Sequence, residues 1–88
     1  MNIEVIWNNI KRHAGEKFYT VTGLELTYVL IADNKIKPYR EGETRWELSK
    51  NLFEKALAYK SDFSSKEFSN KIIGSSYVRG ILEDPRIM

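Results

Sequence analysis

The sequence contains no cysteine, a single histidine and only two prolines among its 88 residues. Without cysteine the chain forms neither a disulfide framework nor a zinc–thiolate site, and a reducing cytosol is its natural setting. A metal site built on His13 needs a second strong ligand, and none lies near it in the sequence. We therefore expect no metal and no cofactor, and we expect His13 to favour the negative end of a helix dipole.

Long hydrophobic segments are also missing. The longest apolar run covers residues 28–32, which is far too short to span a bilayer. The early Glu4 and the interrupted apolar residues around it do not resemble a signal peptide. These features predict a cytoplasmic protein with no membrane partner.

Charge of neither sign dominates. Fourteen basic and twelve acidic residues give a net charge of +2, and the two signs stay nearly balanced along the chain. An obvious nucleic-acid binder carries a concentrated basic surface, and no stretch of this sequence forms one. Any such surface must come from a few residues that the fold brings together.

What the chain does contain is a change of hydrophobic period, which is typical of a single α+β domain over residues 1–88. The N-terminal part predicts a helix at about 3–13, capped by Asn2. Its apolar face consists of Ile3, Ile6, Trp7, Ile10 and Ala14. This periodicity also places Trp7 in the core.

Alternation and turn residues then predict an antiparallel meander of three or four strands, at 18–22, 24–31, 35–40 and 44–48. Near the end of the second strand, Val29 and Ile31 make the far face apolar, which predicts a central strand covered on both sides there. Pro38 cannot donate to a ladder, so the third strand is predicted to be short or at an edge. Trp46 is predicted to lie in the core.

The rest of the sequence predicts three short helices packed on one face of the sheet. Ser49 caps the first, at about 50–60. A capping box begins at Ser64 and opens the second helix. Ser75 or Ser76 caps the third, which ends before the final proline.

No catalytic arrangement is evident. A metal-dependent nuclease needs acids and a lysine on one side of a strand, and the spacing of Asp33, Glu47 and Lys50 does not provide it. Ser75 and Ser76 have the position of helix caps, and a serine nucleophile needs an activating base. The scattered glycines form no phosphate-binding loop. We expect a protein that is not an enzyme.

One group of residues on neighbouring strands predicts a nucleic-acid surface, in which a tyrosine stacks on bases and cations contact phosphates. The group is Lys35, Lys37, Tyr39, Arg40 and Arg45. The alternative is a solvated sheet face on which these cations pair with Glu41, Glu43 and Glu47. Those acids would neutralise the surface and weaken phosphate binding.

The segment 66–84 offers a second DNA-binding hypothesis, because two short helices joined at a glycine resemble a helix-turn-helix unit. Arg79 would then face DNA, but Glu83 and Asp84 would repel phosphates unless they point away. A partner surface is a further hypothesis. Tyr59 and Phe63 flank a loop and would mark a protein contact if both are exposed; otherwise they close the core over the loop.

Most of the chain resembles small bacterial proteins of the kind found on mobile elements and phages. The resemblance rests on residues 18–23, Tyr28, Ser49 with Phe53, Ala56 and Leu57, and residues 74–77 before Ile81 and Leu82. It implies a bacterial cytoplasmic setting and attaches no activity. Taken together, the sequence predicts a non-enzymatic binding or regulatory module with nucleic acid as its leading ligand. The alternative is a protein–protein interaction module, homodimers included, with no nucleic-acid role.

Overall fold

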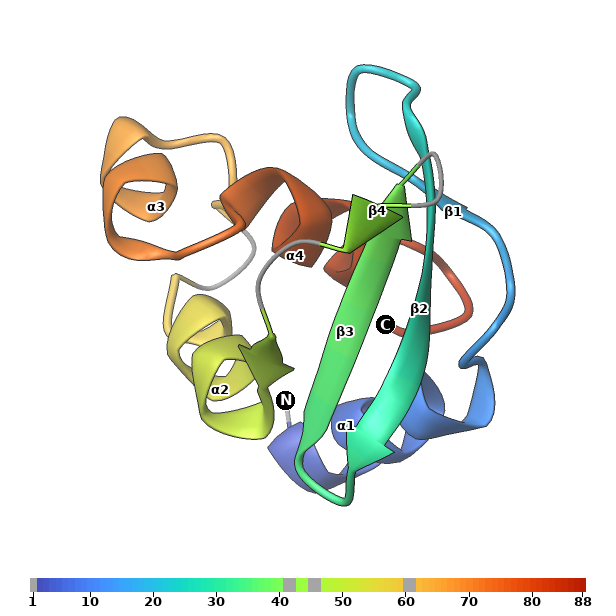
Figure 1. Cartoon of the computed structure of the whole chain (residues 1–88). Coiled ribbons are helices and arrows are strands. Elements are labelled where there is room, and N and C mark those ends of the chain that lie inside the picture. Colours follow the sequence, from blue (N-terminus) through green and yellow to red (C-terminus); the bar gives the residue numbers. More distant parts are fainter. Residues whose placement is uncertain (1, 41–42, 45–46, 60–61) are drawn as a thin grey trace.

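The computed structural model describes residues 2–40, 43–44, 47–59 and 62–88. It has an N-terminal helix, an antiparallel sheet and then three helices, which confirms the predicted α+β architecture (Figure 1). Glu41, Arg45, Trp46 and Lys60 lie outside the described residues, as does the side chain of Glu43. Within the described ranges, no helix is long and apolar enough to cross a membrane.

Helix α1 spans Ile3–Arg12 and confirms the first predicted helix. The side chain of Asn2 caps it by accepting a hydrogen bond from the backbone N–H of Glu4 at 2.8 Å. Trp7 is buried, as predicted, and its ring N–H donates to the carbonyl of Asp33 at 2.9 Å. This bond ties α1 to the turn that follows the second strand.

The sheet has the spatial order β1-β2-β3-β4, in which each strand pairs antiparallel with the next, and a further short strand, β5, also pairs with β3. The strands are β1 (Phe18–Tyr19), β2 (Glu25–Ala32), β3 (Lys35–Arg40), β4 (Glu43–Thr44) and β5 (Leu48–Ser49). The predicted meander is therefore confirmed, but in place of the single strand predicted at 44–48 the described residues form two short strands, β4 and β5. Its longest pairing is the β2–β3 hairpin, in which Thr27 lies opposite Tyr39 and Val29 opposite Lys37.

Strand β3 corrects the prediction that Pro38 marks a short or edge strand. The strand runs for six residues and has neighbours on both sides, and Pro38 is buried opposite Tyr28. On its second side, β5 pairs with residues 35–36 and β4 with residues 39–40. Pro38 thus lies between the two short partner strands. Among the described residues, no strand pairs with it on that side, so its missing backbone N–H costs no hydrogen bond there.

Three helices complete the fold: α2 (Lys50–Leu57), α3 (Lys66–Lys71) and α4 (Ser75–Leu82). Ser49 caps α2, as predicted. The cap of α3 is Ser65 rather than Ser64, because the Ser65 hydroxyl accepts the N–H of Phe68 at 3.1 Å. Gly74, and neither of the predicted serines, holds the cap position of α4, with a left-handed φ of 65° that suits glycine.

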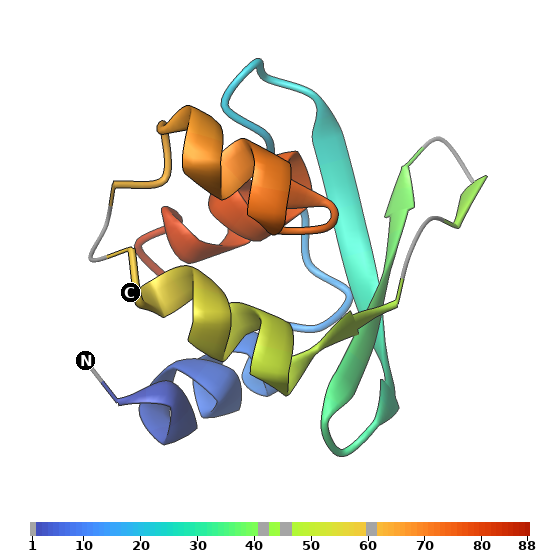
Figure 2. The ribbon, with the colours of Figure 1, turned by 90° about the vertical axis from the view of Figure 1, so that its left-hand side faces the viewer.

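The hydrophobic core lies between the helices and one face of the sheet (Figure 2). Leu26, Tyr28 and Ile36 point into it from the hairpin, and Trp7 and Phe53 meet there with ring centroids 5.7 Å apart. The other face of the β2–β3 hairpin has no helix against it in Figure 2. This face of the hairpin is therefore accessible to a ligand.

Candidate functional site

The uncovered face of the hairpin is formed by alternate residues of its two strands. Cross-strand pairing sets Thr27 beside Tyr39 and Val29 beside Lys37, while Leu26 and Ile36, on the alternate positions, are buried. The face therefore carries an aromatic side chain together with aliphatic and basic side chains. It is built like the solvated side of a sheet that is packed on one side only.

The last four residues of β2 form an exposed apolar segment: Val29, Leu30, Ile31 and Ala32, here called the apolar hairpin end. Val29 is 37% exposed, and Leu30 and Ile31 are each 42% exposed. The prediction that this end is covered on both sides is wrong. The reason is geometric. No helix packs on the outer face of the hairpin in Figure 2, and β1 pairs only with Glu25 and Leu26, which leaves the rest of that edge of β2 without a neighbouring strand.

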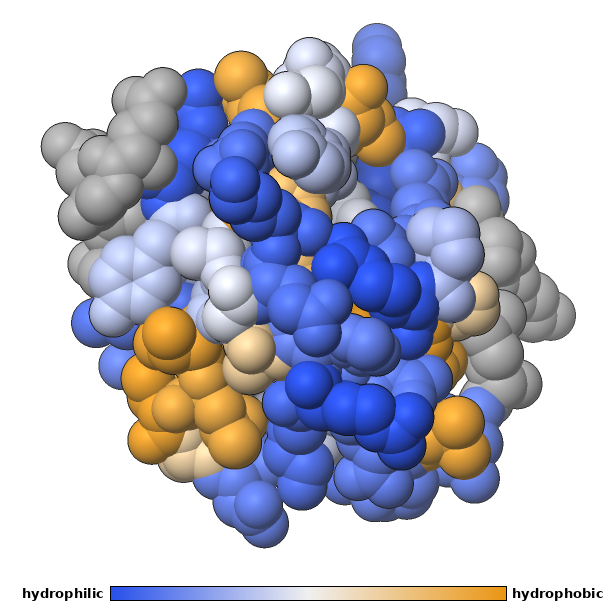
Figure 3. Space-filling model, turned by 90° about the vertical axis from the view of Figure 1, so that its right-hand side faces the viewer, coloured by the Kyte–Doolittle hydropathy of each residue, from blue (hydrophilic) through white to orange (hydrophobic). Residues whose placement is uncertain are grey.

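The surface view supports this description. Figure 3 looks onto the side of the molecule where β2 lies, and most of that side is hydrophilic. Hydrophobic residues gather at its lower left, in the direction in which the β2–β3 hairpin ends in Figures 1 and 2. An apolar patch surrounded by polar residues is typical of an interaction surface.

The backbone of β2 is also open along this edge. The carbonyl of Tyr28 accepts the N–H of Gly15 at 2.8 Å and so points away from β3. Backbone groups of alternate residues point the same way in an antiparallel strand, so the N–H and C=O of Leu30 face the same free edge. Within the described ranges, no other backbone group pairs with Leu30 on that side.

The predicted basic surface is only partly assembled. Lys35, Lys37 and Tyr39 share the uncovered face, but Lys35 forms an ion pair with Glu47 at 3.7 Å. Arg40 alternates to the other face and is half-buried. Arg45 lies outside the described residues.

Arg79 belongs to a different part of the molecule. It lies in α4 and forms an ion pair with Glu83, one helical turn away, at 3.2 Å. In α4 the residues Tyr77, Val78 and Ile81 are buried in the core. A recognition helix needs several free side chains on its outer face, and the described α4 offers few.

Tyr59 and Phe63 do not meet the condition set for a partner surface, which was that both rings be exposed. Phe63 is only 3% exposed, and Tyr59 is half-buried. Both rings pack on Phe68, with centroid distances of 5.3 Å for Tyr59 and 5.2 Å for Phe63. They close the core over the loop, which was the alternative interpretation.

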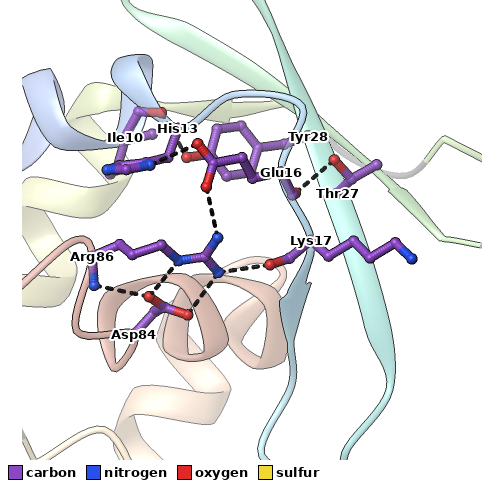
Figure 4. Close-up of polar contacts among 8 residues, drawn as sticks. All are labelled: Ile10, His13, Glu16, Lys17, Thr27, Tyr28, Asp84 and Arg86. Atoms are coloured by element: carbon purple, nitrogen blue, oxygen red, sulfur yellow. Dashed lines mark hydrogen bonds and ion pairs between the residues drawn. The ribbon is translucent and has the colours of Figure 1, made fainter.

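A second polar cluster, not foreseen from the sequence, surrounds Arg86 (Figure 4). Its guanidinium binds both carboxylate oxygens of Asp84 at 2.9 Å, one oxygen of Glu16 at 2.9 Å and the carbonyl of Lys17 at 2.6 Å. It also lies over the ring of Phe18, 4.0 Å from the centroid. One cation therefore joins the C-terminal segment to the segment between α1 and β1.

The charges of this cluster satisfy one another. His13 lies at the C-cap of α1, where the dipole argument placed it, and its Nδ1 is 2.8 Å from Glu16. Hydrogen bonds from His13 and Arg86 lower the pKa of Glu16, and the Arg86 hydrogen bond lowers the pKa of Asp84. Such a fully paired arrangement is typical of a structural link rather than of a catalytic acid or base.

No signal in the sequence could have found this cluster, because Glu16 and Arg86 are 70 positions apart. Tyr28, at its edge, is buried and donates its hydroxyl to the carbonyl of Ile10 at 2.6 Å. Burial raises the pKa of Tyr28, so its ring stays neutral. Among the described residues, no group of three histidine or acidic side chains is arranged to hold a metal ion.

Surface hollows give no stronger site. One hollow, with a volume of about 470 Å³, lies between α2 and α3 and is lined by Lys55, Tyr59, Lys71 and Ile72 among others. Lys71 at its rim is paired with Glu67 at 3.6 Å. Within the described part of the chain, every buried side-chain polar atom has a hydrogen-bond partner, so none is left for a ligand to satisfy.

No protein-family model, curated protein or solved structure matches the chain. The candidate binding surfaces of the described chain are therefore the two described above, the apolar hairpin end and the uncovered face beside it.

Proposed function

We propose that this chain is a non-enzymatic binding module whose ligand is a protein, and that the ligand binds at the apolar hairpin end. The observation that carries the proposal is the combination of exposed apolar side chains at residues 29–32 with an open strand edge. A strand edge of this kind offers backbone hydrogen bonds and side-chain contacts to an incoming extended segment. The bacterial cytoplasm is the setting we propose for this binding.

A nucleic-acid ligand is the second candidate, supported by Lys35, Lys37 and Tyr39 on the same face. The charges favour protein over nucleic acid. Lys35 pairs with Glu47, and Lys17 pairs with Glu25 at 3.9 Å. Among the described residues of this face, Lys37 is the cation without an ion pair. One phosphate contact changes the salt slope of binding by about 0.9 and supports only weak binding.

The proposal is tested by peptide selection. A display library of random 12-residue peptides is selected against the wild-type protein and against the double variant Val29→Lys/Ile31→Lys. We expect extended apolar peptides to be enriched on the wild type and lost on the variant, because edge lysines oppose strand addition.

The control is Val5→Lys, which places a lysine at an exposed apolar position on α1, away from the hairpin end. It should keep the peptides that the wild type selects. Failure of the wild type to enrich any peptide, or equal enrichment on the double variant, would contradict the proposal. A gel shift of a 20-nucleotide single strand at low salt that disappears with Lys35→Ala/Lys37→Ala would favour the nucleic-acid candidate instead.

A further inference from the structure

The protein ligand of the proposed function has a specific candidate. We infer that a second copy of this chain binds at the apolar hairpin end, by antiparallel pairing of β2 with β2 of the copy, with Leu30 on the two-fold axis. The inference rests on the proposed function, since it names the partner of the same surface. It is carried by the backbone direction, the side-chain register and the local charge.

The backbone direction allows self-pairing at one position. Because the Tyr28 carbonyl points away from β3 to Gly15, the N–H and C=O of Leu30 point outward on the same side. A residue with both groups facing outward pairs with its own copy across a two-fold axis through two hydrogen bonds. Gly15 already occupies the Tyr28 carbonyl, so the pairing cannot extend far toward Glu25.

The register that follows brings apolar side chains together. With Leu30 on the axis, Val29 lies opposite Ile31 of the second copy, and the reverse pair forms on the other side of the axis. Side chains that lie directly opposite each other on neighbouring antiparallel strands pack together, and apolar β-branched side chains suit such packing. Side chains that are more than a third exposed in one copy would thereby cover one another.

Local charge also permits a second copy. The two charged pairs next to the hairpin end, Lys11–Asp33 at 3.5 Å and Lys35–Glu47 at 3.7 Å, are each closed within one chain. The Lys37 side chains of the two copies would be three strand spacings apart, roughly 14 Å. That separation exceeds the Debye length of about 8 Å at physiological salt, so their repulsion is largely screened.

The pairing must be short. The ladder between β2 and β3 shifts register between Leu30 and Ala32, and such an irregularity bends a strand and limits edge pairing. Because Gly15 occupies the Tyr28 carbonyl, the pairing is limited to Val29, Leu30 and Ile31 of each copy, a contact at the small end of protein interfaces. We therefore expect a weak dimer that forms only at high protein concentration.

Sedimentation equilibrium of the full chain from 10 µM to 1 mM tests the inference. The wild-type mass should rise from 10.3 kDa toward twice that value. Ile31→Lys should remain monomeric, while Ile73→Lys, at an apolar position that is 62% exposed and lies after α3, should associate like the wild type. Circular dichroism confirms that each variant is folded.

The register is tested by oxidative cross-linking, which is clean here because the chain has no cysteine of its own. Residues paired across the axis have Cα atoms about 5.5 Å apart, within reach of a disulfide. Leu30→Cys should therefore form a covalent dimer at concentrations where Leu24→Cys does not. Leu24 is the matched control, since it is the same residue type with the same 42% exposure and lies just before the other end of β2.

A wild-type mass of 10.3 kDa across the whole range overturns the inference. So does association of Ile31→Lys at the wild-type level, loss of association in Ile73→Lys, or equal cross-linking of Leu24→Cys and Leu30→Cys. If the wild type stays monomeric but still selects peptides at the hairpin end, the proposed function stands and only the identity of the partner is wrong.

Discussion

Gly80 is a residue at which α4 packs tightly against the backbone of Tyr19 and Thr20. A Cβ atom at this position would lie 2.6 Å from the Tyr19 carbonyl oxygen and 3.1 Å from the Cα of Thr20. Both neighbours are backbone atoms of β1 or of the turn that follows it, so they cannot move aside as a flexible side chain would. The absence of a side chain is what allows α4 to pack on the strand that begins the sheet.

We therefore predict that Gly80→Ala destabilises the fold, although alanine is the better helix former. Overpacking against the backbone of Tyr19 should lower the free energy of unfolding by about 1–3 kcal/mol, measured by urea denaturation. Ser76→Ala, on the exposed side of the same helix, should stay within about 0.5 kcal/mol of the wild type. An equal or higher stability of Gly80→Ala would show that α4 has room to shift.

At the scale of elements, short-range rules identified most helices and strands. Asn2 and Ser49 cap the helices they were predicted to cap, because a cap depends only on the next three residues. The covering of Val29 and Ile31 could not be predicted, since an apolar alternation does not say whether another element reaches it. The exposed part of the candidate surface was missed for that reason.

The start of α3 also shows that short-range sequence rules cannot always identify the capping residue. Ser64 and Ser65 both satisfy the local pattern of a helix cap, and the burial of Phe68 against Phe63 and Tyr59 coincides with the cap at Ser65. The hydroxyl of Ser64 instead donates to Asp62 at 3.2 Å on the surface. Local sequence preferences allow either serine as the cap, and the observed cap is the one found together with the packing of Phe68.

This correction gives a prediction with a matched control. Ser65→Ala removes the acceptor of the Phe68 N–H and should lower the free energy of unfolding by about 1 kcal/mol. Ser64→Ala should change it by less than about 0.5 kcal/mol, because that side chain makes only an exposed contact. Urea denaturation of the pair measures both effects. The reverse order of stabilities would restore Ser64 as the cap.

At the scale of the whole molecule, the ends of the described chain are joined by side chains rather than by strands. Asn9 of α1 donates to the carbonyl of Ile87 at 3.0 Å, and Arg86 reaches Glu16 and Lys17. Ile87 itself is buried. Contacts between residues 70 or more positions apart leave no periodic trace in a sequence, so this part of the structure could not be predicted from it.

The Arg86 link makes the stability of the molecule depend on pH. Arg86→Met should lower the free energy of unfolding at pH 7 by about 1 kcal/mol, a value that allows for solvent screening of a partly exposed group. Arg12→Met, an exposed arginine of α1, should stay within about 0.5 kcal/mol. Urea denaturation at pH 7 and pH 3 measures both variants against the wild type.

The sign of the pH effect follows from the lowered pKa values of Glu16 and Asp84 in the folded state. A carboxyl with a lowered pKa adds stability above its unfolded pKa of about 4, and that stability is lost as the pH falls through the folded value. The wild type should therefore lose its advantage over Arg86→Met between pH 7 and pH 3. A difference that stays constant over this range would mean that Arg86 acts through its packing on Phe18 rather than through its ion pairs.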